Sequence, residues 1–285
     1  MTDNSFPFFD AIPLPVGQRL ALAVEYNGSK FHGWQLQKHC VEQTVQGRVE
    51  KALSTVANAP VRVHCAGRTD AGVHASEQII HFDAPTSRSI KAWVMGGNAQ
   101  LDNAIAFKWA IPVAQEFHAR FSASHRRYRY VIYNAAIRSA IMAGKVSWEK
   151  LPLDVSLMDA EAQCLLGEQD FSAFRAASCQ SRTSMRCVHK VSVSRLADLV
   201  VVDIQANAFL HHMVRNIAGA LLDVGSGRRR QGWIEQVLRS GDRSRGSVTA
   251  SPFGLYLVSV GYAEEYNLPL SSPGPGFLPA GFSDC

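Results

Sequence analysis

The sequence predicts an α+β protein in which each half of the chain combines strands with covering helices. Runs of β-branched and aromatic residues recur along the chain, and helical periodicity appears between them in both halves. The 285 residues suffice for two ordinary domains. A composition of 47% hydrophobic and 19% charged residues is typical of a globular protein.

In the first half, the sequence "RLALAVEY" predicts a strand and is followed by Asn27-Gly28, which has turn chemistry. Apolar residues at helical spacing predict a helix that begins after Thr44, a suitable N-cap. The predicted elements are a strand at 19–26, a helix at 44–57, strands at 61–66 and 77–84, a helix at 89–101 and a strand at 104–114.

The second half has the same character. It is predicted to hold a strand at 128–134, a helix at 155–166, a hairpin at 188–206 that turns at Ala197-Asp198, helices at 209–225 and 233–240, and a strand at 254–262. On the 209–225 helix, Leu210, Met213, Ile217, Leu221 and Val224 fall on one face. We therefore expect a flexible arm at 1–16, α+β domains at 17–115 and 116–264, and a disordered Pro/Gly-rich tail at 265–285.

The net charge of +5 permits a polyanionic partner, so the distribution of charge has to decide. The stretch "FHARFSASHRRYRYVIYN" at 117–134 interleaves Arg126 and Arg127 with tyrosines. Cations neutralise phosphates and aromatic rings stack on bases, so this pattern suits RNA. A half-buried edge strand with solvated arginines is the structural alternative. A second arginine cluster comprises Arg228, Arg229, Arg230, Arg239, Arg243 and Arg245.

Several classes of protein are disfavoured. The six cysteines contain no C-x-x-C pair, which favours reduced thiols over a zinc site or a disulfide framework. The N-terminus lacks the regions of a signal peptide, and no apolar run approaches the length of a membrane span, so we expect a cytoplasmic protein. Phosphate-binding glycine motifs of nucleotide sites are absent from the sequence. His211 and His212 are adjacent, which does not suit joint chelation on a helix, and no metal or other cofactor is expected.

The stretch "AGRTDAGVHA" at 66–75 lies between two predicted strands and carries more chemistry than a plain turn requires. Gly67 and Gly72 let the backbone turn and allow a ligand to approach closely. Asp70 is then a candidate functional carboxylate, with Arg68 nearby to direct it. A turn aspartate that caps its own loop is the alternative, and the residues alone leave it open.

These residues resemble the active-site signature of the tRNA pseudouridine synthase A family. Further blocks resemble that family in the same order, namely "YNGSKFHGWQ", "TVQGRVEKAL", "FHARFSASHRRYRYVIYN", "GEQDFSAFRAASCQSRT", "NAFLHHMVRNI" and "GLYLVSVGY". The resemblance spans residues 19–262. Ser251 stands where members of the family more often have alanine, a departure that does not fall on a site residue.

The resemblance implies isomerisation of uridine to pseudouridine at positions 38, 39 and 40 of the tRNA anticodon stem-loop, without metal or organic cofactor. Asp70 matches the nucleophile that acts on a flipped-out uridine, and Arg215 matches its arginine partner. Tyr128 matches the tyrosine that stacks on the uracil. The remaining expected substrate-binding residues are Arg68, Leu255, Arg126 and Arg127. Thr69 and His74 are expected to hold the turn together.

The resemblance also implies two related α+β domains whose sheets join into one mainly antiparallel sheet, with a cleft between them, and a homodimer that binds tRNA. A catalytically inactive tRNA-binding protein of the same fold is the alternative, against which the presence of Asp70 argues. A retaining glycoside hydrolase would need two carboxylates flanking the scissile bond, and the loop offers one.

Overall fold

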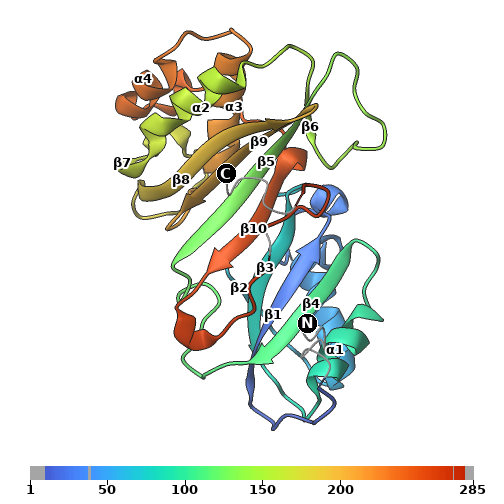
Figure 1. Cartoon of the computed structure of the whole chain (residues 1–285). Coiled ribbons are helices and arrows are strands. Elements are labelled where there is room, and N and C mark those ends of the chain that lie inside the picture. The colour runs from blue at the N-terminus through green and yellow to red at the C-terminus, as the bar shows by residue number, and fades with distance from the viewer. Residues whose placement is uncertain (1–9, 38–39, 272, 280–285) are drawn as a thin grey trace, which may run out of the picture. The chain divides into compact units, whose positions relative to one another are not determined.

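The computed structural model describes residues 10–37, 40–271 and 273–279. Their contacts divide the chain into two compact units (Figure 1). The first unit consists of the chain up to Ser124 together with Val260–Pro273, and the second of His125–Ser259 together with the chain from Gly274. This division differs from the boundary expected at residue 116, because Phe117 and Ala119 are fully buried in the core of the first unit.

The first unit contains a small antiparallel sheet. Its strands are β1 (Arg19–Tyr26), β2 (His64–Cys65), β3 (His74–Asp83) and β4 (Ile105–Pro112). β1 lies between β3 and β4, and β2 pairs with β3. The strand predicted at 19–26 is confirmed to the residue, whereas the one predicted at 61–66 reduces to two residues.

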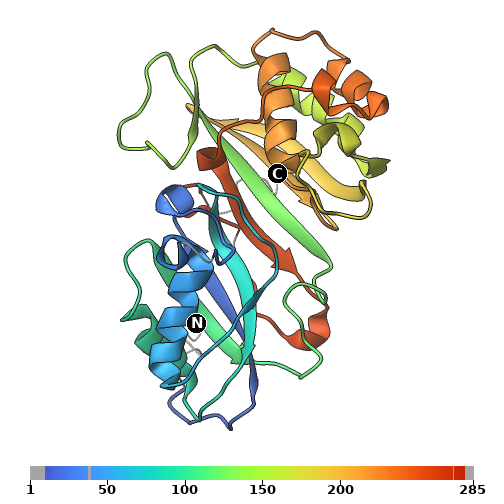
Figure 2. The same ribbon diagram turned by 180° about the vertical axis from the view of Figure 1, so that it is seen from behind.

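Both faces of β1 are covered. On one face, Ala21 and Ala23 leave room for the rings of Trp109 and Phe117 in a common hydrophobic cluster. The helix α1 (Val45–Ala57) lies against the other face of this sheet (Figure 2). The predicted cap of that helix is confirmed, because the Thr44 hydroxyl accepts a hydrogen bond of 3.2 Å from the Gly47 N–H.

The second unit contains a larger sheet. Its strands are β5 (His125–Asn134), β6 (Ser147–Glu149), β7 (Gly167–Asp170), β8 (Met185–Leu196), β9 (Leu199–Ala206) and β10 (Leu255–Gly261), the last of which ends in the first unit. The order is β10-β5-β9-β8-β7, with β6 parallel to β5. The β5–β9, β7–β8 and β8–β9 pairs are antiparallel. β5 is therefore an interior strand, and the predicted turn at Ala197-Asp198 joins β8 to β9.

Three helices gather on one side of this sheet, namely α2 (Val155–Ala162), α3 (Met213–Gly225) and α4 (Trp233–Ser240) (Figure 1). All five residues predicted for the apolar face of the 209–225 helix are buried. The predicted start of that helix at residue 209 is wrong, because α3 begins at Met213. His212 is its N-cap residue, and its left-handed φ of +62° is not helical. Helical hydrogen bonding therefore begins later than the apolar spacing suggested.

Segments predicted to be flexible carry ordered contacts where they are described. Residues 1–9 of the predicted arm, and 272 and 280–285 of the predicted tail, lie outside the described residues. Within the arm, Pro13 forms a β-bridge with Ser89. Within the tail, Tyr266 packs its ring against Phe117, with centroids 5.1 Å apart, and Leu278 is buried. Burial of these apolar side chains offsets the entropy cost of ordering a proline-rich chain.

The predicted α+β class is confirmed, with mainly antiparallel strand pairing. Among the described residues, no helix is both long and apolar enough to span a membrane.

A buried imidazole on β3 links the stability of the first unit to pH. His81 accepts a hydrogen bond from the Ala119 N–H through Nδ1 at 3.1 Å. Burial, reinforced by His118, His64 and Arg19 and opposed by Asp83, lowers the pKa of His81 from 6.5 to about 3. The folded state therefore keeps this ring neutral while the unfolded chain protonates it.

We predict that the free energy of unfolding falls as the pH is lowered from about 6.5 towards 3, by on the order of 1 kcal/mol per pH unit from this group. Urea denaturation at several pH values measures the slope. The variant His81→Asn keeps an acceptor for Ala119 but does not titrate, so its slope should be smaller. Equal slopes in the two proteins would contradict the prediction.

Candidate functional site

The loop that bears Asp70 connects β2 to β3 in the first unit. Its base is fixed by the Gln78 side chain, whose Nε2 donates to the Gly67 carbonyl at 2.5 Å and whose Oε1 accepts from the Gly67 N–H at 3.2 Å. Gly72 adopts a φ of +80°, which favours glycine. Asp70 is half-buried and Arg68 is exposed. The Asp70 carboxylate is therefore carried by a loop whose backbone is fixed by hydrogen bonds at its base.

The end of β1 and the segment that follows it hold the Asp70 loop from one side. The Tyr26 hydroxyl and the Thr69 hydroxyl are 2.8 Å apart, and the Trp34 N–H donates to the Thr69 carbonyl at 3.0 Å. Gly33 has a φ of +91°, and a Cβ there would lie 2.7 Å from the Thr69 carbonyl oxygen and 3.1 Å from the Ala71 nitrogen. Only glycine permits this close approach.

His74 provides a second attachment. Its Nδ1 accepts a hydrogen bond of 3.0 Å from the Gly28 N–H, which places the ring proton of neutral His74 on Nε2. A Cβ at Gly28 would collide with the Val73 carbonyl. Buried Thr69 and His74 thus hold the turn together, as the sequence predicted.

Tyr128 lies on β5 in the second unit. Its side chain is buried, and its ring meets that of Phe209 edge to face, with centroids 5.1 Å apart. On the same face, Tyr130 is fully buried and donates its hydroxyl to the Ser251 carbonyl at 2.9 Å. Burial raises the pKa of Tyr130 to about 12. The phenol of Tyr130 is therefore structural, whereas Tyr128 packs against a half-buried phenylalanine.

Alternate residues of β5 form a buried ion cluster on the opposite face. Arg127 donates to both carboxylate oxygens of Asp203, at 2.7 and 2.8 Å, and Arg129 donates to Oδ2 of the same residue at 2.8 Å. The Arg127 side chain is only 11% exposed. This burial argues against the phosphate contact expected for Arg127. Arg126 is half-buried, and its Nη1 donates to the Asn207 carbonyl at 3.1 Å.

Arg215 lies on the first turns of α3. Its Nε donates to the Ala250 carbonyl at 2.9 Å, and the Ala250 N–H donates to the Arg215 carbonyl at 3.2 Å. The Arg215 side chain is half-buried. Leu255 begins β10 and is buried.

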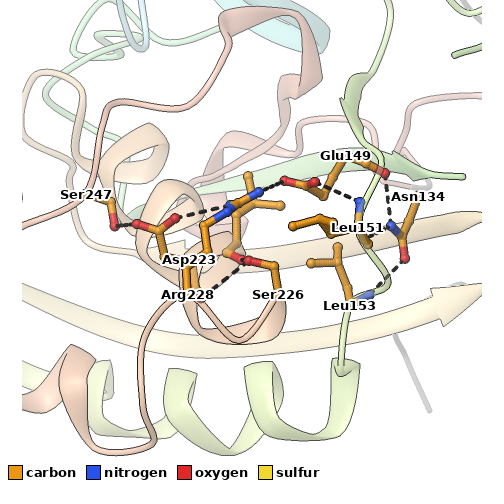
Figure 3. A network of polar contacts seen from close by, with 9 residues as sticks. Asn134, Glu149, Leu151, Leu153, Asp223, Ser226, Arg228 and Ser247 are labelled. Atoms are coloured by element: carbon orange, nitrogen blue, oxygen red, sulfur yellow. Dashed lines mark hydrogen bonds and ion pairs between the residues drawn. The ribbon is translucent and has the colours of Figure 1, made fainter. Parts of the chain in front are cut away.

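The second arginine cluster is engaged mainly within the protein. Arg228 bridges Glu149 at 2.7 Å and Asp223 at 3.2 Å, and Asp223 also accepts from the Ser247 hydroxyl at 2.6 Å (Figure 3). Arg243 donates to the side chains of Asn216 and Thr249. Arg230 and Arg245 are exposed.

The predicted site residues thus fall into two groups. Asp70 and Arg68 lie on one loop of the first unit, and Tyr128, Arg126, Arg127, Arg215 and Leu255 belong to the second unit. Sequence reasoning missed Asp203, the partner of two β5 arginines. A lone acidic residue within the apolar run "VVVDIQA" is the signal that could have identified it.

Comparison with known proteins gives consistent matches. The sequence pattern of a family described as tRNA pseudouridine synthase matches residues 22–122 and 162–263. A tRNA pseudouridine synthase A of Legionella pneumophila (strain Lens) is 54% identical over 260 residues, covering 91% of this chain and 98% of the relative. One of Coxiella burnetii (strain Dugway 5J108-111) is 53% identical over 261 residues, covering 92% and 99%. Among solved structures, a chain of a Cbf5-Nop10-Gar1 complex has a TM-score of 0.34 and 10% identity over 84% of this chain and 49% of that one, a likeness too weak to carry an argument.

We predict that Asp203→Ala lowers the free energy of unfolding by about 3 to 5 kcal/mol, because it leaves two buried guanidiniums without their carboxylate. Urea denaturation measures the change. The matched control Glu235→Ala removes the partner of Arg239 from an exposed pair and should cost no more than about 1 kcal/mol. Similar losses in both variants would contradict a special role for the Asp203 cluster.

Proposed function

The chain belongs to the family of tRNA pseudouridine synthases, which isomerise uridine to pseudouridine in tRNA, and we propose that Asp70 is its nucleophile. One observation carries this proposal: a half-buried carboxylate stands on a loop that Tyr26, Gly28 and Trp34 hold in a fixed shape. Such positioning is what a nucleophile requires. The proposed targets are uridines 38, 39 and 40 of the anticodon stem-loop, as the resemblance implies.

The reaction is an isomerisation and balances without an external oxidant or group donor. The N1–C1′ glycosidic bond breaks, the uracil turns, and a C5–C1′ bond forms. The hydrogen on C5 is lost as a proton, and N1 gains one. The carboxylate adds to the nucleoside and is released at the end, so Asp70 is regenerated.

A paired or stacked uridine has to leave its helix before a side chain reaches C1′ or C6, at a cost of a few kcal/mol. We assign Arg68 to the space that the base vacates, because its side chain is exposed two residues from Asp70. Tyr128 and Leu255 are proposed to form the walls for the uracil. The guanidinium of Arg215 is proposed to pair with Asp70 and fix the direction of its carboxylate.

Arg126 is proposed to contact the tRNA backbone. It is more exposed than its neighbour Arg127, which is committed to Asp203. Arg127 supports the strand from within. We also propose a homodimer, as the resemblance to the family implies, and light scattering on a sizing column tests it.

We predict that Asp70→Asn abolishes pseudouridine formation, with a loss on the order of 10⁴-fold or more, while tRNA binding survives. The amide keeps the shape of the carboxylate but cannot act as the nucleophile. Mapping of pseudouridine in anticodon arms measures activity, and filter binding measures affinity.

Asp102→Asn is a matched control in the first unit. The Asp102 carboxylate accepts a hydrogen bond of 2.9 Å from the Ala104 N–H, and the amide oxygen of asparagine can accept the same bond. This control should retain activity. Substantial turnover by Asp70→Asn would reject the nucleophile assignment, and a wild-type protein that binds tRNA without modifying it would favour the inactive alternative.

We predict that Arg126→Ala weakens tRNA binding and reduces its salt dependence. The negative slope of log affinity against log salt should become shallower by about 0.7 to 0.9, the value for one phosphate contact. The matched control Arg62→Ala removes one exposed guanidinium of the first unit, which pairs with Glu50 at 2.9 Å, and should leave the slope unchanged. An unchanged slope in Arg126→Ala would show that this residue makes no phosphate contact.

A further inference from the structure

The chain between β4 and β5 presents an aromatic ring to solvent in the first unit. Phe121 is 76% exposed. Its ring lies against His118, with centroids 4.3 Å apart and planes inclined by 32°. The Arg120 guanidinium carbon lies over the Phe121 ring, 5.7 Å from its centroid. An exposed ring is thus combined with a supporting ring and a cation.

The backbone that carries Phe121 is held rigidly. The N–H groups of Arg120 and Phe121 both donate to His118 Nδ1, at 3.1 and 3.3 Å. The Ser122 N–H donates to the His118 carbonyl at 2.9 Å, and the Ser122 hydroxyl accepts from the His118 N–H at 3.0 Å. Together with the bond from Ala119 to His81, these contacts fix five successive residues, 118–122. The backbone around Phe121 is therefore fixed by hydrogen bonds and not by burial of the phenyl ring.

Two further imidazoles continue the row of rings, through buried His81 to exposed His64. The His118 and His81 rings are 4.5 Å apart, and the His81 and His64 rings are stacked at 4.9 Å with planes 18° apart. His81 and His118 each accept N–H groups through Nδ1, which requires neutral rings. The phenyl ring therefore ends a column of aromatic rings and does not stand alone.

This column begins beside the Asp70 loop. His64 lies on β2, and Cys65 follows it directly. Burial raises the pKa of the Cys65 thiol to about 12, and both Arg68 and Arg120 lie near enough to oppose that rise. The exposed ring thus belongs to the same part of the first unit as Arg68, the residue proposed to enter the RNA.

We propose that Phe121 is a stacking platform for an unpaired base of the tRNA substrate, with Arg120 binding an adjacent phosphate. The proposal rests on the proposed function and extends its substrate-binding surface. Stacking of a base on an aromatic ring contributes about 1 to 3 kcal/mol and tolerates any base, so the platform requires no particular base at this position. The incoming base replaces the guanidinium over the ring, and the guanidinium turns to the backbone.

An unmodified tRNA transcript with uridine at position 39 is the probe. We expect Phe121→Ala to weaken binding by about 5-fold to 100-fold with an unchanged salt slope, because a base and not a phosphate is lost. Phe121→Trp keeps an aromatic ring and should bind tRNA as the wild type does. Phe121→Leu keeps an apolar side chain without a ring and should bind as weakly as Phe121→Ala. Arg120→Ala should lower the salt slope by about 0.7 to 0.9.

Leu270→Ala is the matched control, since Leu270 is a fully exposed apolar side chain of the same unit. This variant should bind tRNA as the wild type does. The melting temperature of Phe121→Ala should match that of the wild type, because the ring is mostly exposed, so the affinity change reports on the contact and not on folding.

Affinity within twofold of the wild type for Phe121→Ala, or equal binding by the Leu and Trp variants, would overturn the platform. A changed oligomeric state with unchanged tRNA affinity would assign the ring to a protein interface and would also overturn it. Pseudouridine formation by the wild type on the same transcript separates the two proposals. If the wild type is inactive, the proposed function fails, and if it is active while Phe121→Ala binds normally, only the platform fails.

Discussion

The close approach of two backbone segments in the first unit is the constraint on which the candidate site depends. Gly28 and Gly33 lie so near the loop at 66–73 that a Cβ at either position would meet loop backbone atoms. This contact replaces solvent with hydrogen bonds to Thr69 and His74. A carboxylate gains catalytic value when its position is fixed before the substrate arrives, because the ordering cost has already been met in folding. The loop is therefore held in one conformation by packing and hydrogen bonds, as a buried segment would be, although Arg68 on it is exposed.

In the second unit, the alternation of side chains along β5 separates structure from recognition. Asp203 draws Arg127 and Arg129 to one face and neutralises them there in part, while Tyr128 points to the other face. Two cations that share one carboxylate remain costly to bury unless each also finds other acceptors. Arg129 has one in the Gly274 carbonyl, at 2.8 Å. A sequence rich in arginine thus devotes part of its charge to the interior.

Much of the fold followed from local chemistry. Thr44 capped a helix where the spacing predicted one, and Ala197-Asp198 turned a hairpin at the predicted place, because both signals are satisfied by neighbours in the chain. The features that were not predicted depend on tertiary contacts or on a single backbone conformation. Apolar spacing continued through the His211-His212 pair, but the left-handed conformation of His212 delayed the helix. The candidate loop was found through its residues and a family resemblance, whereas the partners of its hydrogen bonds and the burial of Arg127 against Asp203 depend on segments distant in sequence.

The discontinuous first unit has a consequence for synthesis on the ribosome. Ala66, at the foot of the Asp70 loop, shares a hydrophobic cluster with Tyr262, Tyr266 and Leu268 from the end of the chain. Residues up to Leu268 must therefore leave the exit tunnel before this cluster can close. The nascent chain completes the hydrophobic core of its first unit only after the second unit has been synthesised, and a chain that stops before Tyr262 lacks the residues that close this core.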